Sequence, residues 1–363
     1  MRTFARSVIV TLAVVSTGFT PAAPEAVSGQ ETSTLQSIGP LAFGPNGVLF
    51  AADTQGAAIY ALELGAAATG GAAGAKDVPQ IDQKIAALLG TESAAIALTD
   101  LAVHPTTKNA FIAVMRGQGA DAKPALVRVD GAGTLEAVAL NDLKFTKAAL
   151  PNAPAANTTG RRNPRNDSIT DMTFVDGKLI VAGLSNEEFA SKLRTIAYPF
   201  ASVEPGTSVE IYHGNHGQLE TRSPVYAFVP YDVAGKPHLI AGYLCTPLVK
   251  FPVASLGGSE KVVGTTIAEL GAGNRPLDMI VYKKDGREFL LMSNTNRGVM
   301  KIPTDGFASA APITSRIGGT AGVPYETIQT MTGVVQMDLL DAQRSLVITR
   351  TEGTLNLQVT ALP

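Results

Sequence analysis

Two of the chain's four histidines lie three residues apart in the segment EIYHGNHGQLETRSP, residues 210–224. An H-x-x-H pair in a glycine-rich loop can supply two imidazole nitrogens to Zn²⁺ or Cu²⁺, but such an ion also needs a third and a fourth ligand. Cys245, the chain's one cysteine, and Asp171 are candidates for those positions. Two other interpretations of His213 and His216 stay open. They can form an ordinary turn, because Gly and Asn tolerate positive φ, or they can act as a general acid or base.

Arginines and asparagines form a second set of residues that could do chemistry. The guanidinium group presents a rigid fork of N–H donors that suits carboxylate and phosphate groups. This set predicts an anionic small molecule or a partner protein as ligand; the alternative is that the arginines pair with nearby acids and brace the loops. The ligand-binding candidates are Arg161, Arg162, Arg165, His213, His216, Arg222, Asn274, Arg275, Asn294, Asn296, Arg297 and Arg350.

Aspartates at the start of apolar segments form a third set: Asp100, Asp171 and Asp278. If these carboxylates meet, they can share Ca²⁺ or another divalent cation, because hard cations take several oxygen ligands. The alternative is that each carboxylate accepts backbone N–H bonds and closes its own turn. The sequence has no G-x-S-x-G elbow, Walker A motif or dinucleotide fingerprint, so those enzyme classes have no support.

A repeat positions these residues. Six units begin near residues 40, 100, 171, 225, 278 and 336, and each has a short apolar alternation, a turn rich in Gly, Pro, Asp or Lys, and a second apolar run. A third alternating segment follows, such as AAIYALEL from Ala57 and GVMKIP from Gly298. Antiparallel strands that recur at this interval are typical of a β-propeller. We therefore predict an all-β protein with six blades of three to four strands, or seven blades if residues 64–98 hide one.

The propeller predicts where the candidate residues gather. Loops that lead into the innermost strands, and loops between second and third strands, emerge on one face because strand direction alternates. A long polar connection from about Asn141 to Asp171 and the loops at residues 213–224, 271–278 and 293–298 would then meet around the channel. We also expect the C-terminal strand to close the ring by pairing with residues near 32 to 37.

A family resemblance follows from the blade pattern. IGPLAFGPNGVLFAAD with GAAIYALEL resembles a blade of the secreted propellers grouped as NHL-repeat, YncE-like and SMP-30/gluconolactonase proteins. In the SMP-30-like enzymes a glutamate before the first inner strand, with Asn and Asp before later ones, holds the metal. Asp171 and Asp278 fall near those positions and Asn274 matches approximately, but the first position reads QSIGP and has no glutamate.

Three functions are consistent with these residues. The first is an extracytoplasmic scaffold that binds an anionic small molecule or a partner protein at its channel face. The second, implied by the resemblance, is a metal-dependent lactonase or esterase-like hydrolase. The third is a periplasmic redox partner that holds copper with His213, His216 and Cys245, although Cys245 also fits a small buried thiol.

The N-terminus predicts export. MRTFAR carries two arginines, an apolar run of 13 residues follows, and TPAAPEA supplies small residues for cleavage between Ala22 and Ala26. We expect a signal peptide over residues 1–26, or else an uncleaved anchor, and one propeller domain over residues 27–363. The mature chain should be secreted or periplasmic, monomeric and free of membrane spans. With a net charge of −2 and no basic stripe, nucleic acid is not an expected partner.

Overall fold

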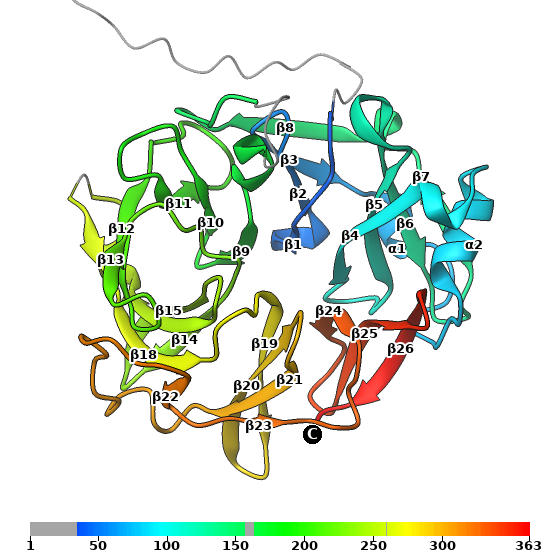
Figure 1. Ribbon diagram of the computed structural model, residues 1–363. Coiled ribbons are helices and arrows are strands. Elements are labelled where there is room, and N and C mark those ends of the chain that lie inside the picture. Colours follow the sequence, from blue (N-terminus) through cyan, green and yellow to red (C-terminus); the bar gives the residue numbers. More distant parts are fainter. Residues whose placement is uncertain (1–34, 157–162, 259) are drawn as a thin grey trace, which may run out of the picture.

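Antiparallel hairpins form at each of the six repeats. The computed structural model describes residues 35–156, 163–258 and 260–363. In these residues six sheets stand in a ring around a central channel (Figure 1). The protein is therefore an all-β, six-bladed propeller, and the prediction of six blades is confirmed. The signal-peptide prediction and Arg161 and Arg162 lie outside the described residues.

The blades contain three to six strands each. Blade 1 has β1 (Leu41–Phe43), β2 (Leu49–Asp53), β3 (Ala58–Glu63) and β8 (Lys144–Ala149), and blade 2 has β4 (Ile96–Val103), β5 (Ala110–Arg116), β6 (Lys123–Val129) and β7 (Leu135–Val138). Blade 3 has β9 (Asp171–Val175), β10 (Lys178–Leu184), β11 (Ser191–Ala197), β12 (Thr207–His213), β13 (Gln218–Glu220) and β17 (Val262–Val263). Blade 4 has β14 (Ala227–Val233), β15 (Lys236–Gly242), β16 (Pro247–Pro252), β18 (Thr265–Leu270) and β22 (Thr320–Gly322). Blade 5 has β19 (Pro276–Lys284), β20 (Arg287–Asn294), β21 (Gly298–Pro303) and β23 (Glu326–Thr327), and blade 6 has β24 (Val334–Leu339), β25 (Arg344–Thr351) and β26 (Thr354–Ala361).

Helices are short and lie outside the blades. Within residues 35–156, 163–258 and 260–363 the two α-helices are α1 (Ala66–Thr69) and α2 (Ile81–Leu88), both in the connection from blade 1 to blade 2. Short 3₁₀ helices occur at Pro45–Gly47, Ser93–Ala95, Gly119–Asp121, Leu140–Asp142, Pro164–Asp167 and Val253–Ser255. Across the described residues, neither α-helix nor any 3₁₀ turn has the length and apolar character needed to cross a membrane.

The order of blades around the ring differs from their order in the chain. Neighbouring inner strands follow the sequence β4, β1, β9, β14, β19, β24 (Figure 1). The reason is β8, which returns after blade 2 and pairs with β3 as the fourth strand of blade 1. Blade 2 is thus inserted between the third and fourth strands of blade 1. The long polar connection expected from Asn141 to Asp171 therefore contains a strand, whose charged residues Lys144 and Lys147 conceal its apolar alternation.

The insertion also changes how the ring closes. Blade 2 meets blade 6, and the connection that carries α2 lies along β26. Val78 forms an antiparallel bridge with Leu357, and the Val359 N–H donates to Asp77 Oδ1 over 2.8 Å. The expected pairing of the C-terminal strand with residues near 32 to 37 is wrong for the described part of that segment, because Ser37 contacts blade 1 instead.

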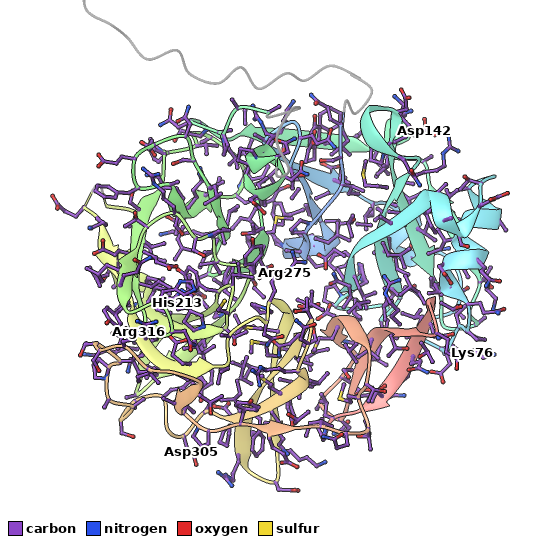
Figure 2. All side chains as sticks on the ribbon, viewed as in Figure 1. Lys76, Asp142, His213, Arg275, Asp305 and Arg316 are labelled. Atoms are coloured by element: carbon purple, nitrogen blue, oxygen red, sulfur yellow. The ribbon has the colours of Figure 1, made fainter. Side chains whose placement is uncertain are left out.

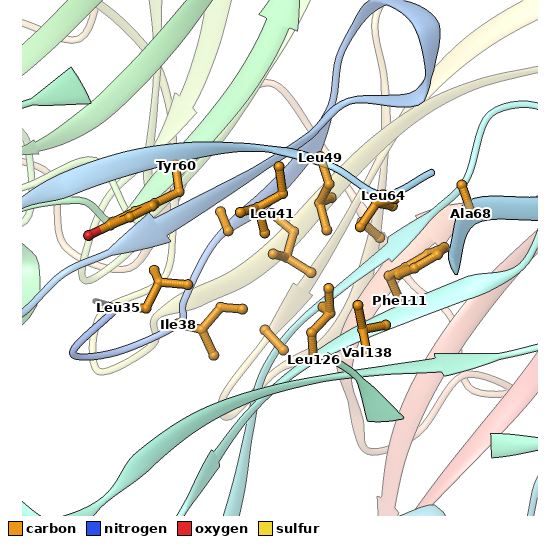
Figure 3. Packing of buried hydrophobic residues seen from close by; sticks show 14 of the residues in the cluster. Leu35, Ile38, Leu41, Leu49, Tyr60, Leu64, Ala68, Phe111, Leu126 and Val138 are labelled. Atoms are coloured by element: carbon orange, nitrogen blue, oxygen red, sulfur yellow. The ribbon is translucent and has the colours of Figure 1, made fainter. Parts of the chain in front are cut away.

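The hydrophobic core is divided among the junctions between blades. In the described residues each of the six clusters of buried apolar side chains lies between two neighbouring blades. Between blades 1 and 2, for example, Leu49 and Tyr60 pack with Phe111 and Leu126, all fully buried (Figure 3). Burying each such side chain contributes about 1.5–3 kcal/mol. The apolar residues therefore hold blade against blade, and the channel wall is left to polar residues of the inner strands.

A close backbone approach in blade 3 gives a first prediction. Gly183 in β10 has an ordinary φ, but a Cβ at this position would lie 2.1 Å from the Ser168 carbonyl oxygen. Gly183→Ala should therefore lower the free energy of unfolding by about 2–3 kcal/mol, since overpacking a rigid backbone contact costs that much. Thermal or urea unfolding would measure the loss. Gly318→Ala, where nothing lies within 4 Å of the added Cβ, is the control; equal stability of the two variants would contradict the prediction.

Candidate functional site

All six blades contribute residues to a cavity at the channel mouth. A cavity of about 340 Å³ opens there. Its lining residues are Ser37, Ile38, Gly39, Pro40, Thr54, Gln55, Thr99, Met115, Asn166, Asp167, Ile169, Thr170, Tyr226, Arg275, Pro276, Leu277 and Gln336. These come from the loops that lead into the inner strands and from loops between second and third strands. A larger hollow of about 600 Å³ lies at the outer rim, beside α1 and β7.

Aspartates line the channel below this mouth and connect neighbouring blades. Asp100 Oδ2 accepts the Leu41 N–H of blade 1 over 2.6 Å, and Asp171 Oδ2 accepts the Phe228 N–H of blade 4 over 2.7 Å. In the same way, Asp278 Oδ2 accepts the Met337 N–H and Asp338 Oδ2 accepts the Val103 N–H. Asp171, Asp278 and Asp338 also accept the N–H of the following residue through Oδ1. Each carboxylate is thus a bridge from one inner strand to the next.

Burial raises the pKa of all four carboxyl groups. The four residues are half-buried by surface area, and their carboxyl groups lie between neighbouring inner strands. Burial raises the pKa of Asp171 to about 7 and that of Asp338 to about 6, against the lowering effect of the accepted N–H bonds. Burial also raises the pKa of Asp100 and of Asp278 well above the usual range. The nearby carboxylates add to both shifts: Asp171 and Asp338 act on Asp100, and Asp100 and Asp171 act on Asp278.

Gln336 joins two of these acids. With its amide oriented to satisfy both neighbours, Nε2 donates to Asp100 Oδ1 over 2.9 Å and to Asp278 Oδ2 over 3.1 Å. Gln336 therefore lies at the base of the mouth cavity and connects blades 2, 5 and 6. Sequence reasoning missed Gln336 and Asp338 as channel residues. A β-bulge between Val334 and Gln336 shifts the register of β24, and no letter of the sequence marks that shift.

The predicted arginines do not converge on one point. Arg275 lines the mouth cavity, and its guanidinium carbon lies 5.1 Å from the centre of the Tyr226 ring. Figure 2 places Arg275 near the centre of the ring. Arg297 packs against Gly271. A Cβ added to Gly271 would lie only 2.4 Å from the guanidinium carbon of Arg297. Arg165 is half-buried and its N–H donates to Asn163 Oδ1. Arg222 and Arg350 are exposed.

The predicted asparagines contact one another. Asn274 is 1% exposed, and its Nδ2 donates to Asn294 Oδ1 over 3.0 Å. Asn274 Oδ1 accepts the Asn296 N–H over 3.0 Å, and the Asn274 carbonyl accepts the Cys245 N–H over 2.7 Å. These residues therefore fix the loops of blades 4 and 5 against each other, beside the channel mouth.

The two histidines and the cysteine come together at the junction of blades 3 and 4. His213 ends β12, and the turn that follows leads into β13 through Gly217, which has a φ of +69°. One ligand atom from each of His213, His216 and Cys245 can be chosen so that all three lie within 4.8 Å of one another. The two imidazole rings have centroids 3.8 Å apart. Figure 2 shows His213 away from Arg275, toward the side where Arg316 lies.

Glu220 holds both imidazoles and was not among the sequence candidates. Its Oε2 lies 3.0 Å from His213 Nδ1, and its Oε1 lies 2.6 Å from His216 Nδ1. Burial acts to raise the pKa of Glu220, but the hydrogen bonds from His213 and His216 outweigh it and hold the pKa at about 2. Strand alternation could have pointed to Glu220. In the β12–β13 hairpin Glu220 pairs with Ile211, and Ile211 lies two residues before His213 and therefore on the same face of the sheet.

A second acid supports the turn between the histidines. Glu269 in β18 is fully buried, and it accepts the Gly214 N–H over 2.6 Å and the Asn215 Nδ2–H over 2.7 Å. Burial raises the pKa of Glu269, while the Gly214 N–H and His213 act in the opposite direction. The turn that carries His216 is thereby fixed from blade 4, the same blade that carries Cys245.

No family model matches the chain, and no curated protein matches it. Among solved structures, a glucose dehydrogenase described as a putative oxidoreductase from Thermus thermophilus is 14% identical, with a TM-score of 0.38, over 93% of this chain and 99% of that one. A streptogramin B lyase is 10% identical, with a TM-score of 0.31, over 92% and 96%. At these values the likenesses carry no argument about activity.

Proposed function

We propose that the protein is an exported binding propeller that holds an anionic small molecule at its channel mouth. The observation that supports this is the mouth cavity itself, because residues of all six blades line it and Arg275 is the one arginine among them. The guanidinium carbon of Arg275 lies 5.1 Å from the centre of the Tyr226 ring, a cation–π contact that would hold the fork of N–H donors in place for a carboxylate or phosphate. A cavity of about 340 Å³ suits a molecule of modest size.

The acids below the mouth are compatible with an anionic ligand. Asp100, Asp171 and Asp278 have raised pKa values and accept backbone N–H bonds, so they present less negative charge to the cavity near neutral pH than three ordinary aspartates would. Asp167 adds one further carboxyl group to the cavity lining. Gln336 separates Asp100 from Asp278 at the base of the cavity. Protonated acids and an amide can donate and accept hydrogen bonds, so they would select hydroxyl or carbonyl groups on the rest of the ligand.

The hydrolase alternative requires a divalent cation on Asp100, Asp171 and Asp278. Both carboxylate oxygens of Asp171 and of Asp278 already accept backbone N–H groups. This leaves them fewer lone pairs for Ca²⁺, which takes six to eight oxygen ligands. A rise in melting temperature with Ca²⁺ that Asp171→Asn removes would favour this alternative over the anion proposal.

Arg275→Ala tests the proposed function. Isothermal titration of the mature protein with citrate and with inorganic phosphate should give one site, whose dissociation constant rises about 10- to 100-fold in the variant, because a charge-assisted hydrogen bond is worth about 1.5–3 kcal/mol. Arg297→Ala is the matched control, since Arg297 lies on the same face but does not line the cavity. Equal affinities of Arg275→Ala and the unchanged protein would refute the assignment of Arg275.

A further inference from the structure

The cluster of His213, His216 and Cys245 is separate from the channel and has its own supporting residues. We propose that these three side chains form a binding site for one copper ion at the junction of blades 3 and 4. The ligand atoms would be Nε2 of each histidine and Sγ of Cys245. None of the three lines the mouth cavity.

The first reason for a metal site is the Nε2 atom of each histidine. Glu220 takes the Nδ1 atom of both rings, which sets the tautomer that carries the proton on Nδ1 and leaves Nε2 to each ring as a lone-pair donor. A carboxylate behind an imidazole is the arrangement that orients metal-binding histidines and raises their basicity. His213 is 1% exposed, and its Nε2 is buried without a hydrogen-bond partner among the described residues. A buried nitrogen without a partner costs free energy unless something binds it.

The second reason for a metal site is the backbone conformation at Cys245. Cys245 and Thr246 have φ values of +63° and +55°, a region that costs a non-glycine residue about 1–2 kcal/mol. Four hydrogen bonds impose this turn: Cys245 N–H to Asn274, Thr246 N–H to Tyr243, Thr246 Oγ1 to Gly271 and Leu270 N–H to Thr246. Backbone strain that persists in this way is found where a side chain must be placed for function. Here it directs Cys245 from blade 4 toward the histidines of blade 3.

The donor set selects the metal. Two imidazoles and one thiolate are the ligands of trigonal copper sites, and soft thiolate ligands favour Cu(I). Structural zinc sites have four protein ligands as a rule, whereas this cluster offers three among the described residues. Metal–ligand bonds of about 2.0–2.3 Å require the donor atoms to approach one another more closely than 4.8 Å. The exposed imidazole of His216 can make that movement.

Copper binding can be tested on the metal-free mature protein. Titration with Cu(I) against a chromogenic chelator should give one equivalent bound, and Zn²⁺ in a parallel titration should bind at least 10-fold more weakly. Cys245→Ser and His216→Ala should each weaken copper binding at least 100-fold. Both positions are at least partly exposed, so the variants should keep the native melting temperature. His238→Ala is the matched control, because that half-buried histidine lies in β15, hydrogen-bonds the Lys236 carbonyl through Nδ1 and is not part of the cluster, so it should leave binding unchanged.

Two further measurements separate a metal site from an ordinary thiol. Copper should slow the alkylation of Cys245 by iodoacetamide at least 10-fold, and His216→Ala should remove that protection. Glu220→Gln should weaken copper binding about 10- to 100-fold, because one amide oxygen cannot accept from both Nδ1 atoms. Copper binding that Cys245→Ser leaves intact, or tighter binding of zinc than copper, would overturn the proposal. These outcomes are independent of the Arg275 test.

Discussion

The free energy of unfolding of this protein is expected to fall as the pH rises from about 4 to about 8. An aspartate in the unfolded chain titrates near pH 3.9, whereas the pKa of Asp171 is about 7 and that of Asp338 about 6 in the folded protein. Over that range the folded state therefore binds more protons than the unfolded state, and stability must decrease with pH. The contribution is fully present below about pH 4 and is lost as the pH rises through the folded pKa values.

The size of this effect should be several kcal/mol. Each unit of difference in pKa corresponds to about 1.4 kcal/mol, so Asp171 alone should contribute on the order of 3 kcal/mol after allowance for water in the channel. Asp100, Asp278 and Glu269 act in the same direction, because burial raises the pKa of each. His104 acts in the opposite direction, since burial lowers its pKa, and Glu220 affects stability only below about pH 4.

Urea unfolding at half-unit steps from pH 4 to pH 8 would measure the slope. Asp171→Asn is the matched variant: it should be less stable at pH 4, because the amide leaves one of two backbone N–H groups without an acceptor, but its slope should be smaller by about one proton. A stability that is constant or that rises from pH 5 to pH 8 in the unchanged protein would contradict the assignment of protonated acids to the channel.

Asp53→Ala is expected to lower the free energy of unfolding by about 3–5 kcal/mol. Asp53 ends β2, is 1% exposed, and accepts hydrogen bonds from the backbone N–H groups of Gln36, Ser37 and Gly56 and from Ser37 Oγ, all within 2.8–2.9 Å. Alanine would leave the buried Ser37 N–H and Ser37 hydroxyl without an acceptor, and each such group costs about 1–3 kcal/mol. The donors of Gln36 and Gly56 are nearer to water and should add less.

The loss should also be local to the channel mouth. Asp53 fixes Ser37, and the next residue, Ile38, lines the mouth cavity and accepts the Thr99 hydroxyl through its carbonyl. Amide hydrogen exchange at Ser37 should therefore accelerate more than exchange in blades 4 and 5. Asp305→Ala is the control, because it removes the same charge from an exposed ion pair with Arg287 and should cost less than about 1 kcal/mol. A similar cost for both variants would show that the hydrogen bonds of Asp53 do not support this segment.

The local sequence pattern predicts the strands of each blade, but it does not predict the order of the blades around the ring. The inner, second and third strands of each blade follow from apolar alternation and turn residues, which are properties of neighbouring residues in the chain. The position of blade 2 in the ring depends on β8, whose Lys144 and Lys147 face solvent. This strand pairs with β3, and the whole of blade 2 lies between the two strands in the chain. Pairing over that distance depends on which sheet edge is still unpaired when the ring folds, and the amino-acid sequence near β8 does not indicate that edge.

The candidate residues divide in the same way. Residue type by itself identified His213, His216, Cys245 and the three inner-strand aspartates as groups able to bind metals, and it identified arginines able to bind anions. Only the tertiary structure decided which of them meet: the histidines with Cys245 and Glu220, Arg275 with the mouth cavity, and each aspartate with a backbone N–H of the next blade. The physical reason is that side-chain chemistry belongs to a single residue, whereas proximity and burial arise when blades distant in the chain pack together and exclude water between them.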